Sequence, residues 1–237
     1  MMKLSPSTID ISAEYREIKK MIMEKERRLI VEYGIRLSKA GLCPGTSGNL
    51  SICLRDKDRT LMAISPSGMD YFSVAPEDIV VTDLEGNIVD GSRKPSSEWA
   101  LHALFYRNRP DVNSVVHTHS LYCTTFAVLK MPIKAVHFAI GAAGVSEVKC
   151  APYELFGTEA LAETAVRECG SANAVLLANH GIICCGSSVM TAFSLAENME
   201  YCARLQYQAM SIGTPELISD ENMIDVFKRL SVYGQKR

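Results

Sequence analysis

The sequence lacks the features that mark membrane and nucleic-acid-binding proteins. No stretch approaches the ~18 consecutive apolar residues of a membrane-spanning helix. The opening residues, Met-Met-Lys-Leu-Ser-Pro, contain no apolar core of a signal peptide. Basic residues are not in excess, since 25 Lys and Arg stand against 27 Asp and Glu. We therefore expect neither a membrane nor a nucleic acid as a partner, because no basic surface is available to hold a phosphate backbone.

Motifs for disulfide and nucleotide chemistry are also missing. The chain has 8 cysteines, but no C-x-x-C pair occurs and Cys184 and Cys185 are adjacent. This pattern favours reduced thiols in a cytoplasmic protein. No Walker loop and no G-x-G-x-x-G occur, which argues against a dinucleotide cofactor. A small anion is still allowed, because backbone amides bind one locally.

What is present is an ordinary globular chain of 237 residues, 47% of them hydrophobic. Helical patterns alternate with hairpins and no linker or repeat is visible, so we predict one α/β domain over residues 1–237. Its architecture is a three-layer α/β/α arrangement, with a central, mostly antiparallel sheet covered by helices. Residues 1–11 are expected to be flexible.

Periodicity and turn residues place the elements along the chain. The predicted helices cover 12–40 (capped by Ser12), 95–109, 121–129, 158–169, 187–211 and 220–231. The predicted strands cover 50–54, 61–64, 79–82, 88–89, 112–117, 145–148, 174–177 and 182–185.

Histidine spacing suggests a metal site. His117 and His119 are two residues apart at the end of a strand, so both side chains leave the same face. His180 lies between two apolar runs and supplies a third imidazole, and Glu98 is either a fourth ligand or a base beside the metal. The other reading, a surface His-x-His and a hydrogen-bonded core histidine, explains these residues equally well. His102 is assigned a structural role.

Three stretches rich in small residues suggest an anion site: 45–49, 65–68 and 96–97. Small residues let backbone N–H groups approach an oxyanion, and hydroxyl groups add donors. Ser96 and Ser97 lie at a predicted helix N-terminus, which favours negative charge. Each stretch taken alone is better explained as a turn or a helix cap. Together they would place a phosphate beside Glu98.

Six short segments are distinctive when they occur together and in order: Gly-Thr-Ser-Gly-Asn-Leu-Ser (45–51), Ser-Pro-Ser-Gly-Met (65–69), Lys-Pro-Ser-Ser-Glu-Trp (94–99), Arg-Pro-Asp-Val-Asn-Ser-Val-Val-His-Thr-His (109–119), Cys-Ala-Pro-Tyr-Glu-Leu-Phe-Gly-Thr (150–158) and Asn-His-Gly (179–181). With them the sequence resembles the class II, zinc-dependent aldolases of the L-fuculose-1-phosphate aldolase type. This family shares a superfamily with L-ribulose-5-phosphate 4-epimerases. The resemblance covers about residues 25 to 234.

The resemblance implies an aldehyde-lyase and a role for each matching residue. A catalytic Zn²⁺, or another divalent ion such as Mn²⁺ or Co²⁺, would be held by His117, His119 and His180. Glu98 would be the acid/base, and a metal ligand when substrate is absent. The substrate phosphate would bind at Gly48, Asn49, Ser67, Gly68, Ser96 and Ser97. Tyr233 matches a tyrosine that contacts the aldehyde part of the substrate. The family assembles as a homotetramer with active sites between subunits.

One departure from the family pattern concerns the aldehyde. Fuculose-phosphate aldolases have His-Tyr where this chain has His137-Phe138, and phenylalanine cannot donate a proton to the aldehyde oxygen. The resemblance predicts cleavage of an L-fuculose-1-phosphate-like ketose 1-phosphate to dihydroxyacetone phosphate and a small aldehyde such as lactaldehyde. The more apolar pocket also suits 5-deoxyribulose 1-phosphate or 5-methylthioribulose 1-phosphate.

Three other functions occur among proteins that resemble this family. The 4-epimerases carry Asp at the position of Glu98, which argues against that activity. A methylthioribulose-1-phosphate dehydratase would eliminate water instead of breaking a carbon–carbon bond. Adducin-like heads keep the fold as interaction modules without the metal ligands, whereas all three histidines and the carboxylate are present here.

Overall fold

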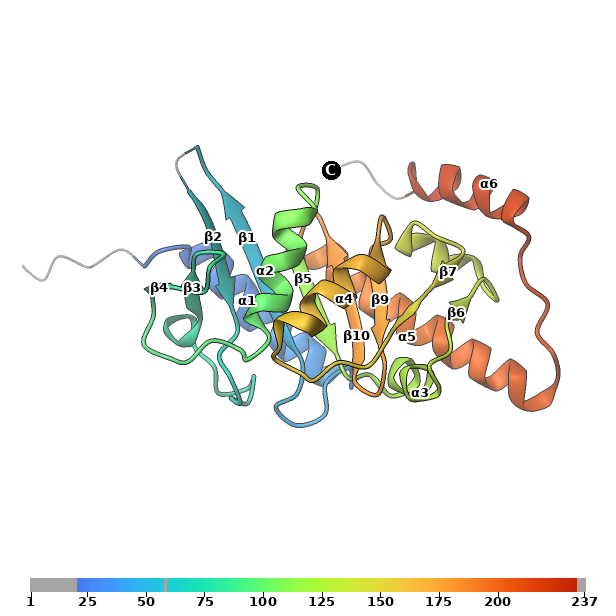
Figure 1. Ribbon diagram of the computed structural model, residues 1–237, viewed down its shortest axis with the longest axis horizontal. Coiled ribbons are helices and arrows are strands. Elements are labelled where there is room, and N and C mark those ends of the chain that lie inside the picture. The colour runs from blue at the N-terminus through green and yellow to red at the C-terminus, as the bar shows by residue number, and fades with distance from the viewer. Residues whose placement is uncertain (1–20, 58, 234–237) are drawn as a thin grey trace, which may run out of the picture.

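The computed structural model describes residues 21–57 and 59–233 (Figure 1). Its main sheet has the strand order β4-β3-β2-β1-β5-β10-β9-β8. Only the β8–β9 pair is parallel, so the predicted mostly antiparallel sheet is confirmed. The strands are β1 (Asn49–Arg55), β2 (Thr60–Ile64), β3 (Val80–Thr82), β4 (Ile88–Asp90), β5 (Ser114–Thr118), β8 (Cys150–Ala151), β9 (Ala174–Leu177) and β10 (Gly181–Gly186).

Helices cover both faces of this sheet, as the three-layer prediction requires. α1 (Glu24–Lys39), α3 (Leu121–Leu129) and α5 (Val189–Ile212) pack on one face, and α2 (Trp99–Asn108) and α4 (Glu159–Cys169) on the other (Figure 1). Their buried side chains recur at helical spacing, as with Ile30 and Leu37 in α1 and Leu101 and Phe105 in α2. Two hydrophobic cores result, one on each side of the sheet.

The elements outside the main sheet include a second, two-stranded sheet. β6 (Ile133–Lys134) pairs with β7 (Glu147–Val148), and the 3₁₀ helix η3 (Phe138–Ala143) lies between them in the chain. α6 (Asp220–Leu230) follows an extended segment and packs on η3 (Figure 1). A second 3₁₀ helix, η2 (Pro76–Asp78), precedes β3.

Several predicted element boundaries were wrong, among them the start of the helix predicted over 95–109, which begins at Trp99. The first helix begins at Glu24, because Met23 adopts a left-handed conformation (φ 55°) that interrupts a helix. The predicted cap Ser12 lies outside the described residues, as do residues 1–11. The strands β6 and β8 were not predicted, since two residues are too few to leave a periodic pattern.

The register of the three central strands sets up the site. Asn49 pairs with His117 across β1 and β5, and His117 pairs with Ile183 across β5 and β10. Both neighbours run antiparallel to β5. The C-terminal end of β5 therefore lies beside the N-terminal ends of β1 and β10, at one end of the central strands. The loops that contain the predicted site residues leave the sheet at this end.

All eight cysteines are free thiols in this structure, and all but Cys150 are buried. Within the described ranges, no helix has the length and apolar character needed to cross a membrane.

Candidate active site

Three imidazole nitrogens converge beside one carboxylate. Nε2 of His117 lies 2.9 Å from Nε2 of His119 and 3.2 Å from Nε2 of His180. The Glu98 carboxylate adjoins them, with Oε2 3.3 Å from His117 Nε2 and Oε1 3.4 Å from His180 Nε2. The four side chains predicted to form the metal site are therefore brought together.

The donor set fits a divalent metal ion. Ligands ~2.0–2.1 Å from a tetrahedral zinc ion lie about 3.3 Å from one another, close to the separations seen here. The buried Oε1 of Glu98 and Nδ1 of His180 have no hydrogen-bond partner among the described residues. Such orphaned polar atoms are costly unless something else satisfies them. An ion among the three imidazoles and the carboxylate would satisfy Oε1.

The protonation states suit a cation. Burial lowers the pKa of His117 to about 4, although Glu98 acts in the opposite direction, and burial also lowers the pKa of His119. Burial alone would raise the pKa of Glu98, but His117, His180 and Asn49 lower it to about 2. At neutral pH the carboxylate is ionised and these two imidazoles are neutral. His117 Nδ1 donates to the Ile182 carbonyl at 3.0 Å, which leaves the Nε2 lone pair for an ion.

Special backbone conformations bring these residues together. Asn179, directly before His180, has a left-handed conformation (φ 56°) in the tight turn between β9 and β10. Asparagine tolerates this conformation better than most residues. Gly48 also has a positive φ (74°), and a Cβ there would meet Cys43 Sγ at 2.3 Å and the His117 carbonyl at 2.8 Å. Gly48 thus lets the loop before β1 lie directly against the histidine strand.

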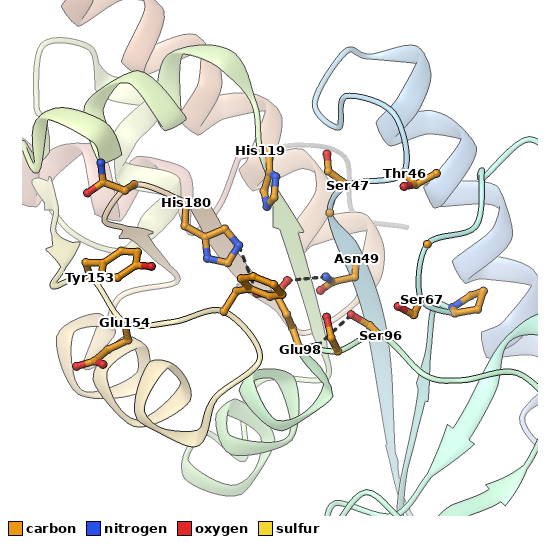
Figure 2. A pocket seen from close by; sticks show the side chains of 16 residues that line it. Thr46, Ser47, Asn49, Ser67, Ser96, Glu98, His119, Tyr153, Glu154 and His180 are labelled. Atoms are coloured by element: carbon orange, nitrogen blue, oxygen red, sulfur yellow. Dashed lines mark hydrogen bonds and ion pairs between the residues drawn. The ribbon is translucent and has the colours of Figure 1, made fainter.

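The site opens into a cavity of about 370 Å³. The predicted phosphate residues line one part of it, and Figure 2 shows His119, His180 and Glu98 between these loops and Tyr153. None of the described residues that line the cavity is Lys or Arg, so an anion there would depend on N–H groups, hydroxyls and the metal. The lining residues of the three loops are Thr46, Ser47, Gly48, Asn49, Pro66, Ser67, Gly68, Ser96 and Ser97.

Two of these loops are tied to each other and to Glu98. The Ser67 N–H donates to the Lys94 carbonyl, and the Ser96 N–H donates to the Ser65 carbonyl, both at 3.0 Å. The Glu98 N–H donates to Ser96 Oγ at 3.3 Å. α2 begins at Trp99 with Glu98 as its N-cap, so Ser96 and Ser97 lie just before the helix. These bonds fix the spacing between the two loops and the Glu98 backbone.

Tyr233 and Phe138, the two residues that the resemblance relates to the aldehyde part of the substrate, do not line this cavity in their own chain. Tyr233 is 86% exposed and Phe138 is 53% exposed. Both line a separate, largely apolar cavity of about 530 Å³ between η3 and α6. The position of Tyr233 within a single chain therefore does not account for its predicted catalytic role.

Sequence reasoning missed several residues of the site. Tyr153, Phe156 and Asn179 line the cavity, and Tyr153 points toward the histidine side in Figure 2. All three belong to the segments 150–158 and 179–181, which carry the family resemblance, and that membership was the available signal. His102 was assigned a structural role, yet it bonds to Asn49 and reaches Glu98 through it.

Comparison with known proteins gives consistent results. Residues 28–207 match the model of the family described as "Class II Aldolase and Adducin N-terminal domain". The chain is 45% identical over 216 residues to a 5-deoxy-D-ribulose 1-phosphate aldolase of Bacillus thuringiensis serovar kurstaki, covering 91% of this chain and 100% of that one. It is 36% identical over 208 residues to a 5-methylthioribulose-1-phosphate/5-deoxyribulose-1-phosphate aldolase of Rhodospirillum rubrum, covering 88% and 92%. Among solved structures, an L-fuculose 1-phosphate aldolase superposes with a TM-score of 0.85 at 38% identity, covering 89% and 98%.

Proposed function

The chain belongs to the class II aldolase family, and from this premise we propose that it reversibly cleaves a ketose 1-phosphate to dihydroxyacetone phosphate and a small aldehyde. The observation that carries the proposal is the cluster of Glu98, His117, His119 and His180 at one side of a cavity whose other side is lined by small-residue loops. Zinc is the proposed metal, because three imidazoles with an adjacent carboxylate are typical zinc ligands.

Glu98 is the proposed acid/base of the reaction. During cleavage the C3–C4 bond breaks, its electrons remain with C3, and the C4 hydroxyl gives its proton to solvent and becomes the aldehyde carbonyl, while Glu98 takes up one proton from solvent. C3 then takes up a proton, which Glu98 delivers, and Glu98 removes the same proton in the reverse direction. When bound, the metal supplies Lewis acidity that stabilises negative charge on the ketone oxygen. The low pKa of Glu98 keeps it ionised and ready as a base.

The phosphate end of the substrate is assigned to Gly48, Asn49, Ser67, Gly68, Ser96 and Ser97. Binding it there fixes the distance from the phosphate to the carbon that faces Glu98, since the loops are joined to each other and to the Glu98 backbone.

The candidate substrates differ in the aldehyde that cleavage releases. L-fuculose 1-phosphate gives lactaldehyde, which carries one hydroxyl, whereas 5-deoxyribulose 1-phosphate gives acetaldehyde, which carries none. Phe138 offers no hydrogen bond, and the relative from Bacillus thuringiensis is more similar than the solved fuculose-phosphate aldolase. We therefore favour the 5-deoxyribulose substrate, with its methylthio analogue next and the L-fuculose type as the alternative.

The role of Glu98 is tested with the variant Glu98→Gln. We expect exchange of the hydroxymethyl proton of dihydroxyacetone phosphate with solvent to fall ~10²–10⁴-fold, because the base is removed while shape is kept. Exchange is followed by NMR in D₂O, and metal content is measured in parallel. Wild-type exchange rates in the metal-loaded variant would overturn the assignment.

The substrate is tested by aldol addition of dihydroxyacetone phosphate to acetaldehyde, methylthioacetaldehyde and lactaldehyde, with and without chelator. We expect kcat/KM to be highest for acetaldehyde and activity to be lost with chelator. A preference for lactaldehyde would favour the L-fuculose type. Loss of water from methylthioribulose 1-phosphate, or epimerisation of L-ribulose 5-phosphate, would support the dehydratase or the epimerase. Purified protein without bound metal would support an adducin-like module.

We further propose that residues 1–237 act as one domain in a cytoplasmic homotetramer with active sites between subunits. Large apolar side chains are exposed on α3, on the second half of α5 and around α6, as expected for surfaces that pair. They include Leu121, Val128, Leu129, Tyr207, Met210, Ile212, Leu217, Ile224, Val232 and Tyr233.

A further inference from the structure

A continuous line of buried polar side chains leads from Glu98 into the interior. Asn49 Nδ2 donates to Glu98 Oε2 at 2.8 Å, and Asn49 Oδ1 lies 2.6 Å from His102 Nε2. His102 Nδ1 lies 2.7 Å from Ser51 Oγ, which lies 2.5 Å from the Tyr106 hydroxyl. Asn49, His102, Ser51 and Tyr106, here called the polar relay, are all buried. Figure 2 shows its outer end, where Asn49 meets Glu98.

The hydrogen bonds of the polar relay all point toward Glu98. Asn49 uses its amide N–H on the carboxylate, so its Oδ1 accepts and His102 Nε2 must donate. A neutral imidazole then has its lone pair on Nδ1, so the Ser51 hydroxyl donates to His102. The Tyr106 hydroxyl in turn donates to Ser51. Every donor has one acceptor, and the tautomer of His102 is fixed.

Glu98 depends on this line for its orientation. Among the described residues, Asn49 is the one side chain outside the histidine cluster that bonds to the carboxylate, and Oε1 has no hydrogen bond. His102 in turn fixes Asn49, because the side-chain oxygen Oδ1 of Asn49 has no other hydrogen bond within the described part of the chain. Rotation of the Asn49 amide would turn an oxygen toward the ionised carboxylate, and His102 prevents this.

We propose that His102 is a positioning residue for the aldol reaction. It holds the Asn49 amide, and through it the Glu98 carboxylate, so that Oε2 stays beside His117 and Oε1 stays beside His180. The proposal rests on the acid/base role of Glu98 proposed above. A fully satisfied buried network selects one geometry, whereas apolar residues of the same volume would serve packing alone. Figure 2 shows that the anchored carboxylate lies beside the cavity that would receive substrate.

The test compares His102→Phe with His102→Gln. Phenylalanine keeps a ring but removes both hydrogen bonds, whereas the glutamine amide can still donate to Asn49. With saturating zinc, we expect His102→Phe to lower kcat for proton exchange of dihydroxyacetone phosphate ~10–100-fold, the usual effect of losing an outer-sphere partner. KM should change less than about 3-fold, and His102→Gln should recover most of kcat.

A third variant controls for lost stability. Gln206 is buried on α5 and bonds to Lys134 and Pro132, away from the relay, so Gln206→Ala removes a buried polar group without touching Glu98. Its kcat should equal the wild type. If His102→Phe loses stability but keeps wild-type kcat per metal-loaded site, or if His102→Gln is as slow as His102→Phe, the proposal is overturned. Glu98→Gln distinguishes failure of the His102 proposal from failure of the proposed function. Wild-type exchange in Glu98→Gln would contradict the acid/base role of Glu98 itself.

Discussion

Among single residues, Gly181 shows how closely the three histidines are held. A Cβ at this position would lie 2.3 Å from the Thr118 carbonyl oxygen and 3.0 Å from His119 Cδ2. The obstacle is largely backbone, which cannot rotate away as a flexible side chain can. Glycine at 181 therefore allows β10 to approach β5 closely enough for His180 to reach the other two imidazoles.

We predict that Gly181→Ala weakens metal binding. The methyl group must displace β10 or His119, which should lower zinc affinity ~10-fold or more and cost about 1–3 kcal/mol of stability. Zinc retained after dialysis against a competing chelator, and urea unfolding, measure the two effects. Gly213→Ala is the matched control, because a Cβ at 213 meets nothing within 4 Å. Equal zinc retention in both variants would contradict the prediction.

His102 predicts a pH dependence of stability. Burial lowers its pKa from 6.5 to about 3, so between these values the unfolded chain binds a proton that the folded protein does not. Stability contributed by neutral His102 is therefore full above pH 6.5 and is lost as pH falls. In chelator, lowering pH from 6.5 to 5 should cost the wild type about 2 kcal/mol more than His102→Gln. Urea unfolding at both pH values measures this, and parallel losses would contradict it.

The histidine cluster was predictable in part. Spacing on a strand places His117 and His119 on one face, which local geometry alone dictates. Their contact with His180, 61 residues further along, could not be predicted from the local pattern. It was predicted from the joint occurrence of the family-like segments. His102 could not be assigned its partners, because Asn49 and Ser51 lie about 50 residues earlier and hydrogen bonds between a helix and a strand leave no trace in spacing.

Among the elements, α3 is notable because another helix caps it. Its N-cap residue, Ser120, makes no side-chain hydrogen bond to the helix. Instead, Glu200 on α5 accepts the N–H groups of Tyr122 and Cys123, both at 2.9 Å. A carboxylate at this end also complements the helix dipole. α5 thus fixes the start of α3, two residues after His119.

We predict that Glu200→Ala lowers the free energy of unfolding by about 1–2 kcal/mol, as expected when a helix loses the partners of its first N–H groups. Glu200→Gln should lose less, since one amide oxygen still accepts. Glu197→Ala, on the exposed side of the same helix, controls for the higher helix propensity of alanine. Urea unfolding measures all three. A Glu200→Ala protein as stable as Glu197→Ala would rule out the cap.

Element prediction succeeded where patterns were long. α4, α5 and α6 each extend within two residues of their predicted limits, because 11 or more residues give a clear helical period. β6 and β8 are two residues long and exist because neighbouring strands offer partners, Val148 for Ile133 and Leu176 for Cys150. Such pairing depends on the tertiary fold, which local sequence does not encode.

For the whole molecule, the separation of two regions is the informative feature. Glu98 lines one cavity, whereas Phe138 and Tyr233 line another between η3 and α6. The sequence resemblance implied active sites between subunits, an arrangement in which these residues would be separated within a single chain. If Tyr233 contacts the aldehyde, it does so in the cavity of a neighbouring copy. The exposed apolar residues near α6 would then be covered by that neighbour.

This arrangement predicts that two inactive variants restore each other. Glu98→Gln and Tyr233→Ala should each be slow alone, and mixing equal amounts after reversible dissociation should recover about one quarter of wild-type aldol activity. The reason is statistical, because each site contains Glu98 from one chain and Tyr233 from another. Half of the chains have the wild-type residue at each position, so one quarter of the sites contain both wild-type residues. The recovered activity is measured with dihydroxyacetone phosphate and acetaldehyde. If both groups served a site within one chain, every site would contain one defect and mixing would restore nothing. If Tyr233→Ala kept full activity, the tyrosine would have no part in handling the aldehyde.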